Sequence, residues 1–295
     1  MKIPPTEEAC DKYREAGRIA REILNKGSGM IKPGGSIRDV VEEIEEMVHM
    51  TGAGLAFPLN ISLNEDAAHD TASLDDGRVF AQGDVVKLDL GVHIDGYIAD
   101  TATTVDLGDN GLLLKASQSA LESAIRLVKP GVMVRDLGEA IQKEIETRGF
   151  RPVMNLTGHG LDRYTIHTPP TIPNFLAPGG GKLEPGMVFA IEPFATTGSG
   201  RVTDKARVEI FSQVGIKPVR LAPARKLLDL VRERRGLPFA RRWVQVEKQD
   251  FALATLVSQG IVRAYPVLAD IPGSLVSQHE HTLIVTEDGV IVTTA

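Results

Sequence analysis

Four acidic residues of the sequence lie inside or directly beside apolar segments that are typical of strands: Asp89, Asp100, Glu192 and Glu280. A buried carboxylate costs several kcal/mol unless it is paired or bound to a metal, and four in one cleft also repel one another. No Lys or Arg stands beside these segments in a repeated way. Two divalent cations would balance the four negative charges in a single step, so the sequence favours a metal site over arginine pairing.

A histidine completes this set of candidate metal ligands. His159 occurs in the segment LTGHGLDRY, where a glycine on each side would allow a ligand to approach closely. Four carboxylates and one imidazole form an oxygen-rich set that suits two hard or borderline metal ions. Two metals about 3.5–4 Å apart can share a bridging water and lower its pKa, which creates a nucleophile for hydrolysis. The residues therefore predict metal-assisted hydrolysis.

The two aspartates belong to a predicted β-hairpin. The segments VVKLDLGVHI and YIADTATTVDL are rich in strand-forming residues, and Asp95-Gly96 between them is a strong signal for a two-residue turn. Pairing about that turn places Asp89 opposite Ala102, with Asp100 on the same face and about 7–8 Å away on the diagonal. Both carboxylates should therefore point into one space, provided that the turn has two residues, because a one-residue slip would reverse the faces.

The chain contains an internal duplication that would build a shared cleft. Two segments each contain a helix, then Lys-Pro-Gly, then Arg-Asp at the start of a second amphipathic helix. Pro33 aligns with Pro130, and Arg38 aligns with Arg135, at a common offset of 97 residues. An apolar strand follows each pair of helices. The sequence predicts a duplicated α/β (α+β) unit with pseudo-twofold symmetry, whose related strands line one cleft.

A basic segment interrupts this acidic body. The 295-residue chain has a net charge of −6, yet residues 205–263 contain 13 Lys and Arg against 5 Asp and Glu. This shift predicts a separate module, helical around PARKLLDLVRERRG and KQDFALATLVSQGIVRA, with RRWVQV as a strand between them. We therefore expect a catalytic domain over 1–206 and 272–295, and a mostly helical, winged-helix-like insertion subdomain over 207–271.

Composition sets the expected compartment. Cys10 is the single cysteine, so the chain can form neither an intramolecular disulfide nor a cysteine-based metal cluster. The first residues do not have the pattern of a secretory signal, and no apolar run is long enough to span a membrane. We expect a cytoplasmic protein that does not bind membranes and works as a monomer.

The segments LDLGVHIDGYIAD, GHG, IEPF and HEHT, in this order across nearly the whole chain, resemble the methionine aminopeptidase family. The resemblance implies the duplicated "pita-bread" fold and a centre of two divalent metal ions per chain. A basic helical insertion between the fourth and fifth ligands resembles the type 2 branch, and the short N-terminus resembles its archaeal form. Carboxylate-rich sites accept Co²⁺, Mn²⁺, Fe²⁺ and Zn²⁺, so the residues do not select one metal.

The resemblance also implies a role for each site residue. The implied metal ligands are Asp89, Asp100, His159, Glu192 and Glu280, with Asp100 and Glu280 bridging both ions. Glu192 would in addition accept the proton of the attacking water. His69 would contact the nitrogen of the scissile amide, and His167 its carbonyl oxygen, where a donor aimed at an oxyanion is worth about 10²–10³ in rate. Phe57 and Ile166 would form walls of an apolar pocket for the methionine thioether.

Three functions remain open on the sequence. The resemblance implies removal of the initiator methionine from nascent proteins whose second residue is small, and the basic insertion could contact ribosomal RNA. Proline-specific aminopeptidases and dipeptidases share the five ligands, but typically surround the last glutamate with Arg-Ile-Glu-Asp, where this chain has Gln-His-Glu-His. A metal-free binding protein of the same fold is the third alternative, although this chain keeps all five ligands.

Overall fold

The computed structural model describes residues 5–295; residues 1–4, with which the predicted catalytic domain begins, lie outside this range. The helices are α1 (Glu7–Ser28), α2 (Ile37–Met50), α3 (Gly111–Leu127), α4 (Val134–Glu146), α5 (Ala222–Val231) and α6 (Gln249–Ser258), with short 3-10 helices η1 (Arg232–Arg234) and η2 (Arg241–Trp243). The strands up to the second helix pair are β1 (Gly54–Leu55), β2 (Asn60–Leu63), β3 (Asp66–Ala68), β4 (Val85–Ile94) and β5 (Tyr97–Asp106). The later strands are β6 (Arg151–Pro152), β7 (Thr157–Asp162), β8 (Thr165–Pro173), β9 (Val188–Ile191), β10 (Phe194–Thr196), β11 (Thr203–Gln213), β12 (Phe239–Ala240), β13 (Val262–Ala269), β14 (Val276–Gln278), β15 (His281–Val285) and β16 (Val290–Val292).

The predicted hairpin is confirmed in position and register. β4 and β5 pair along their whole length, and Asp89 lies opposite Ala102 as predicted. Asp95 and Gly96 form the turn with φ values of 51° and 88°. Positive φ at both central residues is the geometry that an Asp-Gly hairpin turn favours, because its twist matches that of the strands.

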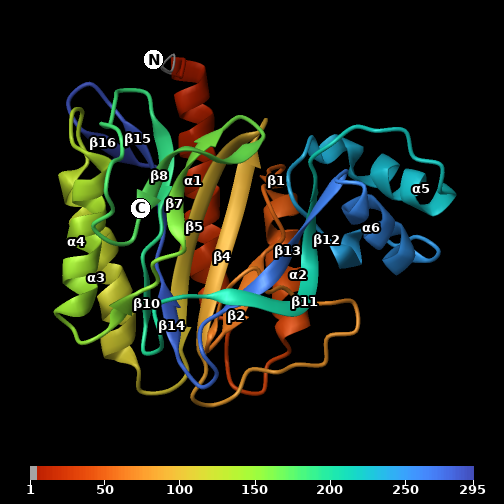
Figure 1. The fold of residues 1–295 in the computed structure, drawn as a ribbon, viewed down its shortest axis with the longest axis horizontal. Coiled ribbons are helices and arrows are strands. Elements are labelled where there is room, and N and C mark those ends of the chain that lie inside the picture. The colour runs from red at the N-terminus through yellow and green to blue at the C-terminus, as the bar shows by residue number, and fades with distance from the viewer. Residues whose placement is uncertain (1–4) are drawn as a thin grey trace.

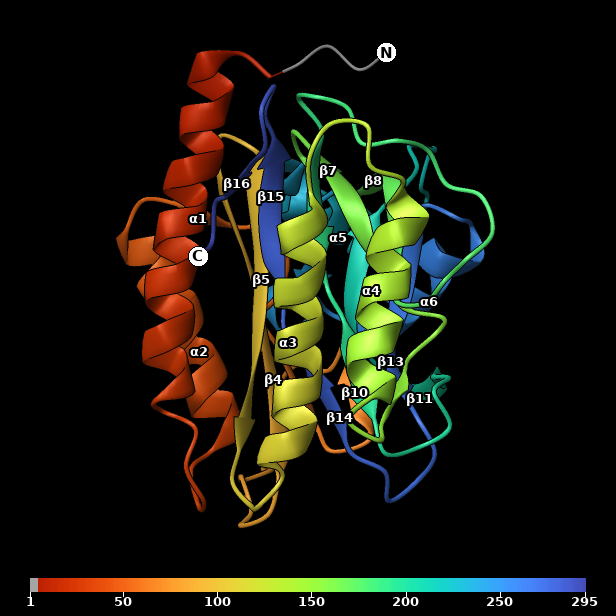
Figure 2. The same cartoon turned by 90° about the vertical axis from the view of Figure 1, so that its left-hand side faces the viewer.

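The duplication is present in the order and packing of the elements. α2 begins at Ile37 and α4 at Val134, which preserves the offset of 97 residues. Figure 2 shows α1 with α2 along one flank and α3 with α4 side by side on the next. The first pair packs on the β4 sheet through one apolar cluster, and the second packs on the sheet of β7, β9 and β15 through another.

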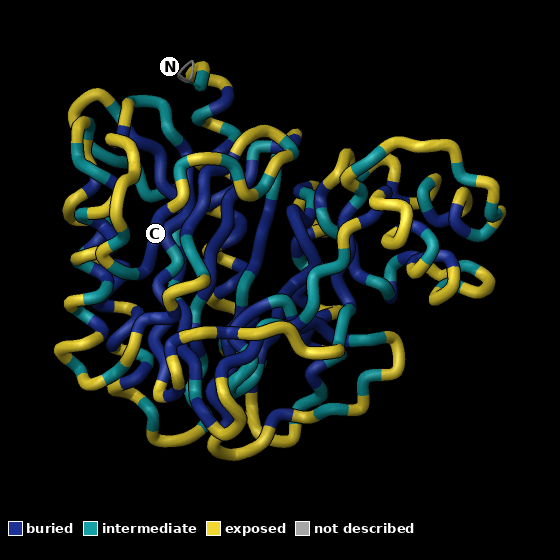
Figure 3. The backbone as a smooth tube through the Cα atoms, in the orientation of Figure 1, coloured by how far each residue is buried: buried dark blue, intermediate teal, exposed yellow. Residues whose placement is uncertain are grey.

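The two halves join at the centre of the molecule. Ala102 of β5 forms an isolated antiparallel bridge with Glu280, which lies between β14 and β15. Buried backbone is concentrated in these central strands, whereas the loops and the outer faces of the helices are exposed (Figure 3). The bridge therefore brings the sheet of the first half against strands from the C-terminal end of the chain.

The basic segment has a small apolar core of its own. Residues from α5, α6, β11, β12 and β13 form this cluster, and the two helices lie at one end of the molecule, away from α1–α4 (Figure 1). The predicted limits at 207 and 271 fall near the ends of a continuous layer, since β11 pairs with β13 and β13 pairs with β3. These limits and the winged-helix-like form remain predictions.

One predicted element of the insertion is wrong. RRWVQV was expected as a strand, but Arg241–Trp243 form the 3-10 helix η2 and residues 244–246 have no regular structure. The physical reason is tertiary, because the consecutive side chains of Arg242 and Trp243 both donate hydrogen bonds to Glu45 of α2. Consecutive side chains of a strand point to opposite faces, so a strand could not make both contacts.

The helices of residues 5–295 include none that is long and apolar enough to cross a membrane.

Candidate active site

The five predicted metal ligands lie in strands, or directly beside strands, of both halves. Asp89 lies in β4 and Asp100 in β5, on the same face of the hairpin, as predicted. His159 lies in β7, Glu192 directly follows β9, and Glu280 lies at the bridge between the halves. All five line one cavity of about 220 Å³.

Short distances connect the members of this group. His159 Nε2 lies 3.7 Å from Asp100 Oδ2 and 3.6 Å from Glu192 Oε1. Ligand atoms of Asp100, His159 and Glu280 all lie within 4.8 Å of one another, which is close enough for one ion to contact all three. Asp89 is joined to Glu280 through Gln278, whose Nε2 donates to a carboxylate oxygen of each at 3.3 and 3.2 Å.

Burial shifts the protonation of these groups. Burial raises the pKa of Asp89 to about 7. Burial, followed by the charges of neighbouring carboxylates, raises the pKa values of Asp100, Glu192 and Glu280 well above their usual range. Burial, followed by the charge of the neighbouring His167, lowers the pKa of His159 to about 3. The imidazole is therefore neutral, as a metal ligand must be, while the carboxylates require a cation to remain ionised near neutral pH.

Unsatisfied polar atoms test whether a metal fits this group. Asp89 Oδ1, Asp100 Oδ1 and Glu280 Oε1 are buried and accept no hydrogen bond. Within the described part of the chain, no Lys or Arg forms an ion pair with any of these three carboxylates. Buried polar atoms without partners are costly. The oxygen-rich donor set and its unpartnered atoms fit divalent cations.

The glycines around His159 have a different role from the predicted one. They were expected to admit a ligand, but an added Cβ at Gly158 would lie 2.3 Å from the carbonyl oxygen of Ala190. At Gly160 it would lie 2.2 Å from the carbonyl oxygen of Pro169. The glycines therefore let β7 approach the backbones of its neighbouring strands, which fixes His159 at the cavity wall.

The two predicted substrate-contacting histidines share an unusual backbone conformation. His69 and His167 have φ values of 65° and 63°, a region that only a few per cent of non-glycine residues occupy, histidine, asparagine and aspartate more often than the others. Strain of this kind concentrates at functional sites. The ring of His167 lies 4.4 Å from that of His159, measured between centroids, so it borders the candidate metal ligands.

The hydrogen bond of His69 defines its tautomer. Its Nδ1 lies 3.3 Å from the carbonyl oxygen of Pro266, which can only accept, so Nδ1 carries the proton. Burial, followed by His167, lowers the pKa of His69 to about 4. The ring is neutral at physiological pH, and its Nε2 is free to accept a hydrogen bond.

The predicted pocket residues also reach the cavity. Phe57 and Ile166 both line it, so all nine predicted site residues surround one space. Phe57 packs directly over Gly91 of β4, where an added Cβ would lie 2.3 Å from the ring. The pocket wall is therefore built against the same strand that carries Asp89.

The sequence analysis missed two site residues that come from distant parts of the chain. Tyr265 lines the cavity, and its ring packs edge-on against His69 with a centroid separation of 5.6 Å. Gln278 is fully buried and bonded to two of the candidate ligands. Its position two residues before Glu280 was the available signal, whereas Tyr265 has no local signal because its partner lies almost 200 residues earlier.

Comparisons with known proteins agree with this geometry. Metallopeptidase family M24 matches residues 11–287. The methionine aminopeptidase of Archaeoglobus fulgidus is 49% identical, covering 98% of this chain and 99% of its own length. The crystal structure of methionine aminopeptidase from Thermotoga maritima is 25% identical, with a TM-score of 0.74 over 100% of this chain and 99% of that chain. The structure of a thermophilic Arx1 is 19% identical, with a TM-score of 0.89 over 98% of this chain and 91% of that one. These matches confirm the predicted pita-bread fold.

Proposed function

Because this chain belongs to metallopeptidase family M24, we propose that it is a metal-dependent aminopeptidase that removes the initiator methionine from new proteins whose second residue is small. One observation carries the proposal: five candidate ligands and four candidate substrate contacts surround a single cavity, in a chain 49% identical over nearly its whole length to a methionine aminopeptidase.

The candidate ligands would hold two divalent cations, Co²⁺, Mn²⁺, Fe²⁺ or Zn²⁺, as the predicted ligand set implies. Asp89, Asp100, His159, Glu192 and Glu280 would bind them. When bound, such ions supply Lewis-acid activation of water and of the peptide carbonyl. This assignment is supported by the unpartnered buried oxygens of the site.

The remaining residues would orient the substrate and move its protons. Glu192 would accept the proton of the attacking water, since its carboxylate lies at the cavity beside His159. Neutral His69 can accept a hydrogen bond from the scissile N–H through Nε2. His167 would donate to the developing oxyanion, a contact that is worth about 10²–10³ in rate. The methionine side chain would lie between Phe57 and Ile166.

We also propose the setting in which the enzyme works. Its substrates would be N-terminal methionine peptides of nascent proteins in the cytoplasm, and it would act as a monomer. Contact with the ribosome through residues 207–271 is supported by the excess of basic residues there and by Ile216, which is 95% exposed beside Lys217. Cosedimentation with ribosomes that weakens as salt is raised would support this contact.

Peptide cleavage tests the proposed activity. The metal-loaded protein is incubated with Met-Ala-Ser and with Ala-Pro-Ala, and the release of free amino acid is followed by mass spectrometry. A chelated sample and Asp100→Ala are measured in parallel. Asp95→Ala is the matched control, because Asp95 belongs to the same hairpin but lies in its exposed turn.

Release of methionine alone, lost on chelation and in Asp100→Ala but kept in Asp95→Ala, is the expected result. Release of alanine from Ala-Pro-Ala would instead assign the protein to the proline-specific enzymes. Failure of the metal-containing protein to cut either peptide would indicate a binding protein, and the proposed function would be wrong.

A further inference from the structure

A buried ion pair outside the candidate active site joins the insertion to the first half of the chain. Glu45 of α2 is 6% exposed and Arg242 of η2 is 8% exposed. Arg242 Nη2 donates to Glu45 Oε1, and Trp243 Nε1 donates to Glu45 Oε2 at 3.0 Å. Burying such a pair costs desolvation that its attraction often fails to recover, so its presence is weak evidence for a role in stability. Its other contacts indicate what it holds.

Glu45 and a second arginine hold the segment that carries Phe57. Glu45 Oε1 accepts a hydrogen bond of 3.2 Å from the backbone N–H of Leu59. Arg234 Nη2 donates to the carbonyl oxygens of residues 55 and 56 at 2.9 and 3.3 Å. Phe57 therefore lies in a short segment that is bonded at both ends to charged side chains. Arg234 of the insertion bonds the first end, and Glu45, which pairs with Arg242 of the insertion, bonds the second.

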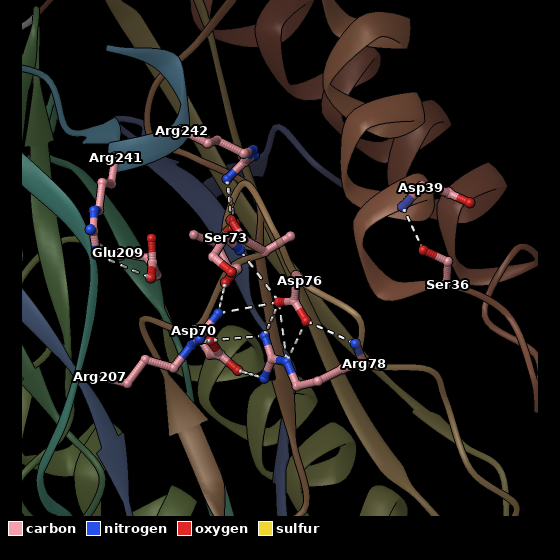
Figure 4. Close-up of polar contacts among 12 residues, drawn as sticks. Ser36, Asp39, Asp70, Ser73, Asp76, Arg78, Arg207, Glu209, Arg241 and Arg242 are labelled. Atoms are coloured by element: carbon pink, nitrogen blue, oxygen red, sulfur yellow. Dashed lines mark hydrogen bonds and ion pairs between the residues drawn. The ribbon is translucent and has the colours of Figure 1, made fainter. Parts of the chain in front are cut away.

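The other arm of Arg242 holds the segment that follows His69. Arg242 Nη1 donates to Thr71 Oγ1 at 3.1 Å and to the carbonyl oxygen of Ala72 at 3.0 Å. Arg207 bonds the same segment through Asp70 Oδ1 at 2.9 Å. Figure 4 shows both arginines directed toward this segment.

The pair of Glu45 and Arg242 therefore lies between the Phe57 segment and the His69 segment, which form two walls of one cavity. A guanidinium can donate several hydrogen bonds in a fixed planar geometry. Arg242 directs Nη1 to the His69 segment and Nη2 to Glu45, which in turn accepts from Leu59 of the Phe57 segment. An ammonium carries its donors on one nitrogen and lacks the planar fork, so it would not reproduce the two directed contacts. The planar fork and the Glu45 carboxylate together therefore link the Phe57 segment to the His69 segment.

We propose that Glu45 and Arg242 are positioning residues that hold Phe57 and His69 at the substrate cavity, so that the insertion determines the shape of the methionine pocket. This inference rests on the proposed function for its meaning in catalysis. It places part of the support for substrate selection in the insertion, whereas the candidate metal ligands lie in or beside strands of the two halves.

Arg242→Lys tests the proposal, because it keeps the charge and removes the fork. Arg241→Lys is the matched control: Arg241 is the preceding residue, and it pairs at the surface with Asp250 and borders Glu209. A double variant, Glu45→Met with Arg242→Met, removes both charges together, so that neither is left buried alone. Thermal melts and metal content establish that each variant is folded and loaded.

Steady-state cleavage of Met-Ala-Ser and Leu-Ala-Ser gives kcat, KM and the preference for methionine. A displacement of about 1 Å at a catalytic contact can cost about 10²-fold. Arg242→Lys and the double variant are therefore expected to lose about tenfold or more in kcat/KM for Met-Ala-Ser and to lose preference for methionine. Arg241→Lys should stay within about twofold of the wild type. Hydrogen–deuterium exchange should become faster in residues 55–59 and 69–72 of the Arg242 variants alone.

Wild-type kcat/KM and preference in both Arg242 variants would overturn the proposal, as would an equal loss in Arg241→Lys. Unchanged exchange in the two segments would overturn it as well, whatever the activity. Should the wild type release no methionine, the proposed function would fail. The exchange measurement would then still decide whether Glu45 and Arg242 position the two segments.

Discussion

Adding one methyl group behind Phe57 should narrow the methionine pocket. Gly91 lies in β4, and a Cβ added there would lie 2.3 Å from Cε1 of Phe57. Carbon atoms pack best at about 3.5–4.0 Å, so the ring must move by more than about 1 Å in Gly91→Ala. Phe57 otherwise packs against a dense cluster that includes Ile98 and Leu161, so the free space available to it is the cavity that it lines.

Overpacking of this kind typically costs about 1–3 kcal/mol. At 1.36 kcal/mol per tenfold, that strain corresponds to about 5- to 150-fold in kcat/KM if it falls on substrate binding and the transition state. Gly91→Ala is assayed by release of amino acid from Met-Ala-Ser and Ala-Ala-Ser. Methionine release should fall by this factor, and alanine release should fall less, because its side chain does not reach the displaced ring.

Gly111→Ala is the control, because an added Cβ there meets no atom within 4 Å. The reasoning is refuted if folded Gly91→Ala cleaves Met-Ala-Ser as fast as the wild type. It is also refuted if both peptides lose rate equally, because Phe57 would then contribute to folding or catalysis without lining the methionine pocket.

Three further outcomes are expected. Divalent metal at 100 times its Kd should raise the free energy of unfolding in urea by about 2.7 kcal/mol. This gain should vanish in Asp100→Ala and persist in Asp95→Ala. An equal gain in both variants would show that Asp100 does not bind the metal. Gln278→Leu should weaken metal binding by about 10–100-fold in calorimetric titration, because its amide orients two candidate ligands; an unchanged affinity would exclude that role. Burial, followed by the charge of Arg234, lowers the pKa of His93 to about 4, below its unfolded value of about 6.5. Between these two pH values the unfolded chain binds more protons than the folded one. The free energy of unfolding therefore falls as pH drops from about 6.5 to about 4. Urea unfolding at several pH values should show a smaller loss of unfolding free energy with falling pH in His93→Gln than in the wild type. The same pH dependence in both proteins would refute the lowered pKa of His93.

Local signals in the sequence were sufficient where local geometry decides the structure. Asp95-Gly96 fixed the register of the hairpin because both residues accept positive φ, and the register alone placed Asp89 and Asp100 on one face. The common offset of Pro33 and Pro130 similarly predicted two matched helix pairs. These features depend on residues close together in the chain, and the structure has them as predicted.

Features that depend on distant partners were not predictable in this way. RRWVQV contains residues that favour strands, but Arg242 and Trp243 lie on the same side because both donate to the buried Glu45. Tyr265 reaches the cavity only because β13 pairs with β3, next to His69. The residue types in a short segment do not predict such conformations, because the contacts that stabilise them are made with partners far away in the sequence.

The arrangement gives the substrate contacts a source of support that the metal ligands do not share. Asp89, Asp100 and His159 lie within strands, and strand pairing fixes their backbone. Phe57 and His69 lie outside regular strands. Groups of the insertion bond both segments, in addition to contacts from the first half such as Gly91 and Arg78.

It follows that changes in the insertion should alter KM and substrate preference while metal affinity is unchanged, whereas changes at Asp89 or Asp100 of the hairpin should weaken metal binding. Two chains with the same metal centre can then differ in substrate through the insertion alone, because the pocket walls depend on it and the ligands do not. A variant of Arg242 with weakened metal binding and intact preference would show that the two kinds of support are joined.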